Sequence, residues 1–428
     1  MIEPAEIFHR WRHEPLLALA VSGGADSLAL MLLAARWHRT AAATPRFLVL
    51  SVDHGLRPEA ADEVAMVGRI AAELGLAFRA LASACPAPGA DVEAAARDLR
   101  YSLLFAAARA EGGAVVMTAH HADDQAETLL LRMARGSGVY GLAAMAVEAE
   151  REGMRIARPL LGRRRAELAS LVAAGGLSPA VDPHNTDIRF ARARMRSLMP
   201  ALAVEGLDTP RLAATAARLR RAAAAIDDYV DRLFACGATV DAAGAVRLDA
   251  ARFASEPEET RLRALARILR AAGGAAYGPR LGSLTTLADG MAGEGDAFVK
   301  RTLAGMVIDR RKGVFRFQRE AGRAGLPECA VSEGCVLRWD GRFDISVKGH
   351  GEGVTVAALG AGGRRQVGAC LPDGLPLAIA ASPALFRNGI LVAAPIVGLD
   401  PPPGSGIIVA MQAIVGRRLF DRARDIDL

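Results

Sequence analysis

Apolar and polar positions alternate in a regular way over residues 1–205. Four apolar runs, at 17–21, 47–53, 114–119 and 155–161, have the length of buried strands, and stretches with helical periodicity lie between them. Buried strands that alternate with helices are typical of a parallel sheet with helices on both faces. The pattern therefore predicts an α/β fold with a doubly wound parallel sheet in this part of the chain.

The pattern changes after residue 205. Two long amphipathic stretches, 212–235 and 256–272, are rich in Ala, Leu and Arg and predict helices. Past residue 320, Gly and Pro recur between short β-prone runs, of which the clearest are 336–339, 343–347 and 389–393. We therefore expect three domains, which are an α/β domain over 1–205, a helical domain over 206–325 and a small β-rich α+β domain over 326–428.

Composition narrows the class of protein. The 428 residues are 52% hydrophobic and 23% charged, which excludes global disorder, and no apolar run reaches the length of a membrane span. The first residues lack the basic start and apolar core of a signal peptide.

The five cysteines form no CxxC pair, which favours a reducing cytoplasm without a zinc or iron–sulfur site; they are Cys85, Cys236, Cys329, Cys335 and Cys370. The net charge of +6 favours a polyanionic partner, although the alanine, arginine and glycine bias of a GC-rich genome accounts for part of it.

The first apolar run ends in two adjacent glycines, Gly23 and Gly24, and a helix-forming stretch follows them. Glycine can adopt backbone angles forbidden to other residues, lets an anion approach the backbone, and here precedes a helix N-terminus with unpaired N–H groups. The loop lacks the lysine of the Walker motif and does not read GxGxxG. The sequence therefore predicts an anion site of another kind.

An acidic residue, Asp26, lies inside this predicted anion site. Its carboxylate would repel a bare polyphosphate, but it would suit a Mg²⁺ ion that bridges phosphate oxygens. The alternative is a simple strand–helix turn in which Asp26 caps the helix. The serines on either side, Ser22 and Ser27, favour the phosphate interpretation because a helix cap does not require them.

A predicted helix from Asp91 carries Arg97, Arg100 and Leu104 at a spacing of i, i+3 and i+7. This spacing places two guanidinium groups and an apolar side chain on one face. Such arginines are either solvated and salt-bridged or available to an anionic ligand.

The third strand leads into Thr118–Thr128, which reads TAHHADDQAET. Asp124 and Glu127 stand at i and i+3, so both carboxylates lie on one face near the start of a helix. Acids there can simply match the helix dipole, or they can form a pocket for a cation or an amine. The spacing of the histidines and acids differs from HExxH, which leaves a zinc site as a minor alternative.

The segment from Asp182 to Arg196 is dense in arginine and contains one aromatic residue, Phe190. Alternating arginines beside an aromatic ring suit phosphate contacts and base stacking, and a solvated basic face is the alternative. The arginines of this candidate RNA-binding segment are Arg189, Arg192, Arg194 and Arg196.

Taken together, these motifs resemble bacterial tRNA(Ile)-lysidine synthases, a family within the PP-loop ATP pyrophosphatases. The resemblance rests on SGGADS at Ser22–Ser27, VDHGLR at Val52–Arg57, AARDLRY at Ala95–Tyr101, TAHHADDQAET at Thr118–Thr128 and RGSG at Arg135–Gly138. It is close over residues 15–200, and beyond them only the layout of the domains agrees.

The resemblance implies an activity and its substrates. ATP would adenylate C2 of the wobble cytidine, position 34, of a tRNA(Ile) with a CAU anticodon. Free L-lysine would then replace AMP to form lysidine, which changes codon reading from AUG to AUA and identity from Met to Ile. ATP and Mg²⁺ are the implied cofactors, no membrane is involved, and the oligomeric state is left open. The helical domain would bind substrate, and the C-terminal domain would bind tRNA.

The resemblance also implies roles for individual residues. Arg100 would act near the α-phosphate and the substrates, while Asp124 and Glu127 would receive lysine, and the sequence does not distinguish which acid is the base. Asp26 would hold Mg²⁺, and Arg189, Arg192, Arg194 and Arg196 would contact tRNA. The residues assigned to ATP are Ser22, Gly23, Gly24, Ala25, Asp26, Ser27, Asp53 and His54.

One position departs from the family, and two alternatives remain. Ala193 stands where the family usually has asparagine between two arginines, which puts the tRNA contacts of this segment in doubt. A PP-loop tRNA thiolase is the nearest alternative, although no cysteine here lies in a motif. A nucleotide-binding protein without catalysis is the alternative from another class, and the acids Asp26, Asp124 and Glu127 argue against it.

Overall fold

A computed structural model describes most of the chain. The described residues are 2–41, 44–53, 55, 60–82, 92–151, 153–180, 189–275, 278–293, 297–322, 325–332, 334–349, 353–367, 376–403 and 405–420, without the side chains of 92–96. The chain divides into two compact units, of which the first is Met1–Ala223 and the second is Ala224–Arg422. Among the helices in these ranges, none is both long and apolar enough to cross a bilayer.

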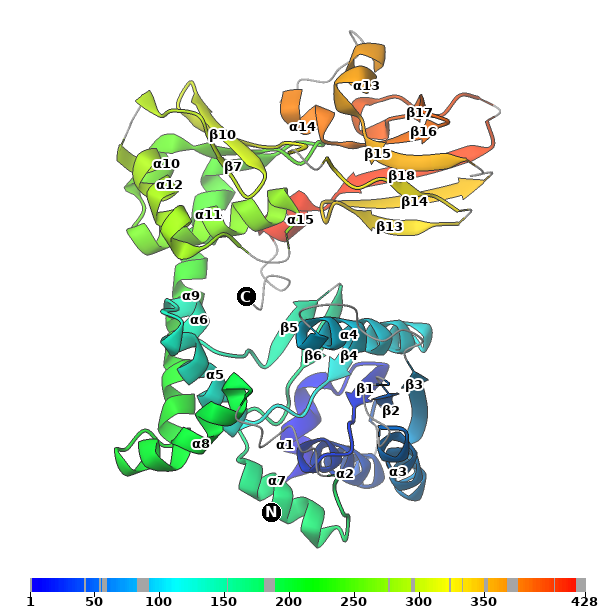
Figure 1. Cartoon of the computed structure of the whole chain (residues 1–428), viewed down its shortest axis with the longest axis vertical. Helices are drawn as coiled ribbons and strands as arrows, with labels where there is room; N and C mark the ends of the chain where they lie inside the picture. Colours follow the sequence, from blue (N-terminus) through cyan, green and yellow to red (C-terminus); the bar gives the residue numbers. More distant parts are fainter. Residues whose placement is uncertain are drawn as a thin grey trace. The chain divides into compact units, whose positions relative to one another are not determined.

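The first unit is built on a six-stranded sheet with the order β3-β2-β1-β4-β6-β5 (Figure 1). Strands β3, β2, β1, β4 and β6 run parallel, and β5 pairs antiparallel with β6 at the edge. The strands are β1 (Leu16–Ala20), β2 (Arg46–Asp53), β3 (Ala77–Ala82), β4 (Val115–Met117), β5 (Glu148–Arg151) and β6 (Met154–Ala157).

Helices cover both faces of this sheet, as the alternating pattern predicts. Leu17 and Leu19 of β1 pack toward α1, α2, α3 and α7, whereas Leu16 and Ala18 pack toward α4 on the other face (Figure 1). The helices of the first unit are α1 (Pro4–Phe8), α2 (Ala25–Thr40), α3 (Ala60–Glu73), α4 (Val92–Ala110), α5 (Ala122–Ala134), α6 (Val139–Leu142), α7 (Arg165–Ala174) and α8 (Ala191–Val204), with the 3-10 helix η1 (His9–Trp11). The doubly wound fold is confirmed.

The second unit begins within the long helix α9 (Thr209–Gly237) and is not purely helical. Helices α10 (Ala250–Ser255), α11 (Glu258–Gly273) and α12 (Leu281–Gly293) share a core with a five-stranded antiparallel sheet and with α15 (Val415–Phe420). That sheet, which the sequence pattern did not reveal, contains β7 (Ala238–Val240), β8 (Val246–Asp249), β9 (Arg301–Leu303), β10 (Met306–Arg311) and β11 (Val314–Arg319).

The rest of the second unit is rich in antiparallel strands, as predicted. One sheet has the order β12-β15-β16-β17 and another has the order β13-β14-β18. The elements are β12 (Cys329–Ala330), β13 (Val336–Trp339), β14 (Phe343–Gly349), β15 (Val354–Ala358), β16 (Pro383–Arg387), β17 (Ile390–Ala393), β18 (Ile407–Ala413), α13 (Gly360–Val367), α14 (Pro376–Ala380) and η5 (Pro395–Val397). The three-domain division over 1–205, 206–325 and 326–428 stays a prediction.

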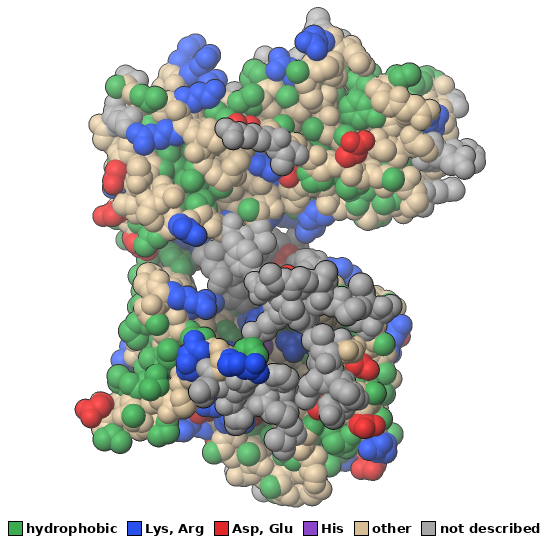
Figure 2. All heavy atoms as spheres, in the orientation of Figure 1, with side chains coloured by type: hydrophobic (Ala, Val, Ile, Leu, Met, Phe, Trp, Pro, Cys, Tyr) green, Lys and Arg blue, Asp and Glu red, His purple; other side chains and the backbone are tan. Residues whose placement is uncertain are grey.

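Lysine and arginine side chains occur on the visible face of both units (Figure 2). Basic side chains on this face are therefore not confined to one unit.

A close backbone approach in the second unit gives a stability prediction. Gly274 caps α11 at φ +73°, and a Cβ atom there would lie 1.9 Å from the carbonyl oxygen of Asp340. We expect Gly274→Ala to destabilise the unit by about 2–4 kcal/mol. The strain of a left-handed backbone at alanine and the overlap of its Cβ atom with the Asp340 carbonyl both contribute. Chemical denaturation measures the change.

The matched control is Gly282→Ala in α12, where a Cβ atom meets nothing within 4 Å. Alanine favours a helix over glycine, so this control should be neutral or slightly stabilising. Equal unfolding free energies for the two variants would contradict the close approach at Gly274.

Candidate active site

The predicted anion loop lies between β1 and α2. Ser27 closes it, because its hydroxyl donates to the carbonyl of Gly24 at 2.9 Å and accepts from the N–H of Ser22 at 3.2 Å. Gly24 is the N-cap of α2 and provides no side-chain cap. The first N–H groups of the helix are thus left for a ligand, which is the arrangement that binds phosphate.

One of the two glycines uses the backbone freedom that glycine offers. Gly23 adopts φ +88°, and a Cβ atom there would lie 3.0 Å from the terminal methyl of Met66. Gly24 adopts φ −71° and ψ 160°, angles open to any residue. The helix-cap alternative for Asp26 is wrong, since Gly24 holds the cap position.

Asp26 has one carboxylate oxygen without a protein partner. Its Oδ2 lies 3.4 Å from Nε2 of His121, whereas its Oδ1 is buried and has no hydrogen-bond partner among the described residues. A buried, unpaired carboxylate oxygen is costly and calls for a ligand. Mg²⁺ prefers one or two carboxylates together with substrate phosphates, so the residues at this loop fit Mg²⁺.

A cavity of about 360 Å³ joins the loop to the predicted substrate residues. It brings together six of the site residues predicted from the sequence and several residues that were not predicted. The lining includes Ser22, Gly24, Asp26, Ser27, Arg100, Tyr101, Thr118, His120 and Asp124.

Four other predicted site residues lie outside the lining of this cavity. Gly23, Ala25, Asp53 and Glu127 are not among the described residues that line this cavity. Asp53 ends β2, and its Oδ1 accepts from the N–H of Gly55 at 2.8 Å. The predicted ATP contact of His54 and the predicted helix cap at Asp91 lie outside the described residues.

Arg100 is an exposed residue of α4 at the cavity wall. Its guanidinium lies 5.6 Å from the ring centroid of Tyr101, and that of Arg97 lies 5.7 Å from the same ring. Tyr101 is 1% exposed and packs with Leu104 on the sheet. The predicted helix face is therefore confirmed, and stacking on a fixed aromatic ring orients Arg100.

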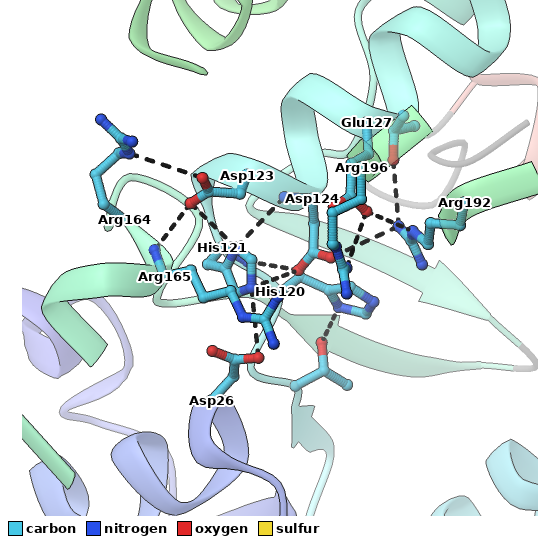
Figure 3. Close-up of polar contacts among 12 residues, drawn as sticks. Asp26, His120, His121, Asp123, Asp124, Glu127, Arg164, Arg165, Arg192 and Arg196 are labelled. Atoms are coloured by element: carbon cyan, nitrogen blue, oxygen red, sulfur yellow. Dashed lines mark hydrogen bonds and ion pairs between the residues drawn. The ribbon is translucent and has the colours of Figure 1, made fainter. Parts of the chain in front are cut away.

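His121 links the loop to α5, a role that the sequence did not reveal. It is the N-cap of α5: its Nδ1 accepts from the N–H of Asp124, and its own N–H donates to Oδ2 of Asp124 at 3.0 Å (Figure 3). Burial opposes the charged form of His121, but the hydrogen bond with Asp26 and the charges of Asp124 and Asp123 outweigh it and raise its pKa. The imidazole of His121 thus holds the carboxylates of Asp26 and Asp124 beside each other.

His120 has the opposite electrostatic character. Burial, followed by the charges of Arg158 and Arg192, holds the pKa of His120 well below its usual value. One ring nitrogen, Nδ1, lies 2.8 Å from the hydroxyl of Thr118. His120 is therefore neutral at pH 7 and cannot compete with a cationic substrate for the acids.

The two acids predicted to receive lysine differ in their surroundings. Asp124 lines the cavity, whereas Glu127 is 2% exposed and is paired with arginines of α8 (Figure 3). Nε and Nη2 of Arg196 donate to Glu127 at 2.7 and 3.2 Å, and Nε of Arg192 lies 3.2 Å from it. Their common helical face is confirmed, but only Asp124 faces the cavity.

Two other arginines of the predicted RNA-binding segment, Arg189 and Arg194, contact each other. The guanidinium of Arg194 donates to the carbonyl of Arg189 at 2.7 Å, and Arg194 is exposed. The tRNA contacts of the four arginines stay a prediction. No cluster of His, Cys, Asp or Glu in the described ranges has the arrangement of a metal site, so the zinc alternative gains no support.

Gln125 is a further residue of this motif whose role the sequence did not show. Its amide is 8% exposed, donates to the carbonyl of Met145 at 2.7 Å and accepts from the N–H of Met145 at 2.7 Å. This pair fixes α5 against the segment before β5. A buried amide with both groups satisfied holds the helix start in one position.

Comparison with known proteins agrees with this geometry. A model of the PP-loop domain matches residues 3–202. The tRNA(Ile)-lysidine synthase of Bradyrhizobium diazoefficiens is 46% identical over an alignment of 327 residues that covers 72% of this chain and 90% of that protein. The tRNA(Ile)-lysidine synthase of Ruegeria pomeroyi is 38% identical over 386 residues, 90% of this chain and 89% of that protein.

Among solved structures, a U34-tRNA thiolase from Methanococcus maripaludis covers 51% of this chain and 77% of its own length. Its TM-score of 0.43 and identity of 15% are too low to carry an argument. The sequence relatives, by contrast, match most of the chain at high identity, and the PP-loop domain holds the cavity. The chain belongs to the tRNA(Ile)-lysidine synthase family of ATP-binding, tRNA-modifying ligases.

Proposed function

We propose that the protein uses ATP to adenylate C2 of the wobble cytidine of a CAU-anticodon tRNA(Ile), and then replaces AMP by L-lysine to form lysidine. The product would read AUA instead of AUG and carry isoleucine identity. The single observation that supports this best is the shared cavity, in which the PP-loop, Arg100 and Asp124 line one space.

The first half-reaction follows from the loop and α4. O2 of the cytidine attacks the α-phosphorus of ATP, and pyrophosphate leaves as the P–O bond breaks. The N–H groups at the start of α2 bind phosphate oxygens, and Arg100 stabilises charge that develops at the α-phosphate. Mg²⁺ held at Asp26 would neutralise part of the polyphosphate charge.

The second half-reaction needs an amine at C2. Asp124, which lines the cavity, receives lysine because its carboxylate supplies negative charge that an ammonium group requires, and Glu127 supports this pocket through its pairing with Arg192 and Arg196. The ε-amine forms the new C–N bond, the C2–O bond breaks, and AMP leaves together with one proton. His120, which is neutral and lines the same cavity, adds no positive charge against the amine.

The test is a product analysis with purified full-length protein, ATP, labelled lysine and total tRNA. The proposal expects AMP and pyrophosphate, with label in an isoleucine tRNA only. Formation of ADP and phosphate, or tRNA without label, would refute it. Sulfur incorporation in the presence of a sulfur donor would indicate a thiolase instead.

A further inference from the structure

The positive charges around Glu127 exceed what this acid needs. Arg196 donates to both of its carboxylate oxygens, at 2.7 and 3.2 Å, and Nε of Arg192 lies a further 3.2 Å from Oε2. The pKa of Arg196 is raised by this pairing with Glu127 despite the opposing effect of burial. Arg196 thus donates to both oxygens of Glu127, whereas Nε of Arg192 is buried without a hydrogen-bond partner among the described residues, so Glu127 holds Arg192 only as an ion pair.

The far end of Arg192 points toward the cavity wall. Its Nη2 lies 3.8 Å from Oδ1 of Asp124, wider than a hydrogen bond (Figure 3). The same Nη2 donates to the hydroxyl of Thr128 at 3.4 Å. The side chain of Arg192 is 40% exposed, against 13% for Asp124. Glu127 thus attracts the inner edge of the guanidinium as an ion pair, and the outer edge lies beside an acid that lines the cavity.

A guanidinium and a carboxylate at this separation match the head group of a free amino acid. The α-carbon of an amino acid carries a carboxylate and an ammonium group side by side. The planar guanidinium of arginine suits the carboxylate. Each group would form a charge-assisted hydrogen bond in place of the loose ion pair. We propose that Arg192 receives the α-carboxylate of lysine and Asp124 its α-ammonium, an inference that rests on the proposed function.

This arrangement places the residues that bind the head group of lysine apart from the place where the ε-amine reacts. The ε-amine, four methylene groups from the α-carbon, extends along the cavity toward Arg100 and the PP-loop, where the adenylate forms. Arg192 is then a specificity-determining residue that distinguishes an amino acid from an amine without a carboxylate. Glu127 and Arg196 are positioning residues, since they hold Arg192 in place.

The test combines a substrate change with a residue change. Lysinamide retains both amino groups of lysine but lacks the negative charge. We expect Arg192→Gln to lower kcat/KM for lysine by about 10–100-fold and to leave kcat/KM for lysinamide unchanged, because the lost bond does not exist with the amide. Arg192→Lys should restore part of the preference for lysine.

Arg165→Gln is the matched control, because Arg165 contacts Asp123 through its backbone N–H, which the substitution keeps, and its side chain is exposed. Pyrophosphate release without lysine, measured on the same preparations, reports folding and the first half-reaction. Equal losses for lysine and lysinamide in Arg192→Gln would overturn the inference. If the wild-type protein forms no lysidine at all, the proposed function fails instead.

Discussion

Replacing Asp26 by alanine should abolish pyrophosphate release, with a loss of at least about 10³-fold in the adenylation rate. Oδ1 of Asp26 is buried and has no hydrogen-bond partner among the described residues, and Asp26 lies in the first turn of α2, directly after the loop. Without it, no carboxylate at the loop can hold Mg²⁺ against the phosphates. Release of labelled pyrophosphate from ATP in the presence of tRNA measures the loss.

Asp62→Ala is the control for the loss of an acidic side chain at the start of a helix, since Asp62 is exposed in the first turn of α3. It should keep full activity. Thermal unfolding of both variants separates lost chemistry from lost folding. Adenylation by Asp26→Ala within tenfold of the wild-type rate would contradict the Mg²⁺ assignment.

Glu127→Ala should act on the second half-reaction. We expect KM for lysine to rise by about 10²-fold, while adenylation changes by less than about tenfold. Glu127 is 2% exposed and binds Arg196 and Arg192, so its removal leaves two guanidinium groups without their shared counter-charge. Arg192 then loses its anchor, and Asp124 gains a competing cation.

Separate assays of pyrophosphate release and lysine incorporation measure this prediction. Glu127→Gln keeps the shape of the side chain and should show the same separation of the two half-reactions. Glu205→Ala, at the exposed end of α8, is the control for the loss of an acid near the same helix. An equal loss in both half-reactions would show that Glu127 does not belong to lysine recognition.

The hydrophobic pattern predicted the strands that lie at the centre of the first sheet and missed those at its edges. β1, β2 and β4 are continuous apolar runs because both of their faces are covered. β3 (Ala77–Ala82) is largely exposed, and β5 carries Glu148 and Arg151, so neither shows the apolar run of a buried strand. In the second unit, β7 and β9 are three residues long, too short for a periodic signal.

The local part of the site followed from the sequence, and the part that depends on tertiary contacts did not. Ser22, Ser27 and Asp26 are neighbours in the chain, so their shared loop was predictable. The pairing of Glu127 with Arg192 and Arg196 joins α5 to α8, whose separation in sequence gives no periodic signal. The same holds for His121, whose contact with Asp26 arises from the packing of α5 beside the loop.

The mass of the nucleoside at position 34 is the most direct test of lysidine formation by this protein. Purified CAU-anticodon tRNA(Ile), incubated with the protein, ATP and lysine, is digested to nucleosides and examined by mass spectrometry. We predict that cytidine 34 gains the mass of lysine less one water. Omission of ATP, or the change Asp26→Ala, should prevent this gain. An unmodified cytidine 34 under complete conditions would contradict it.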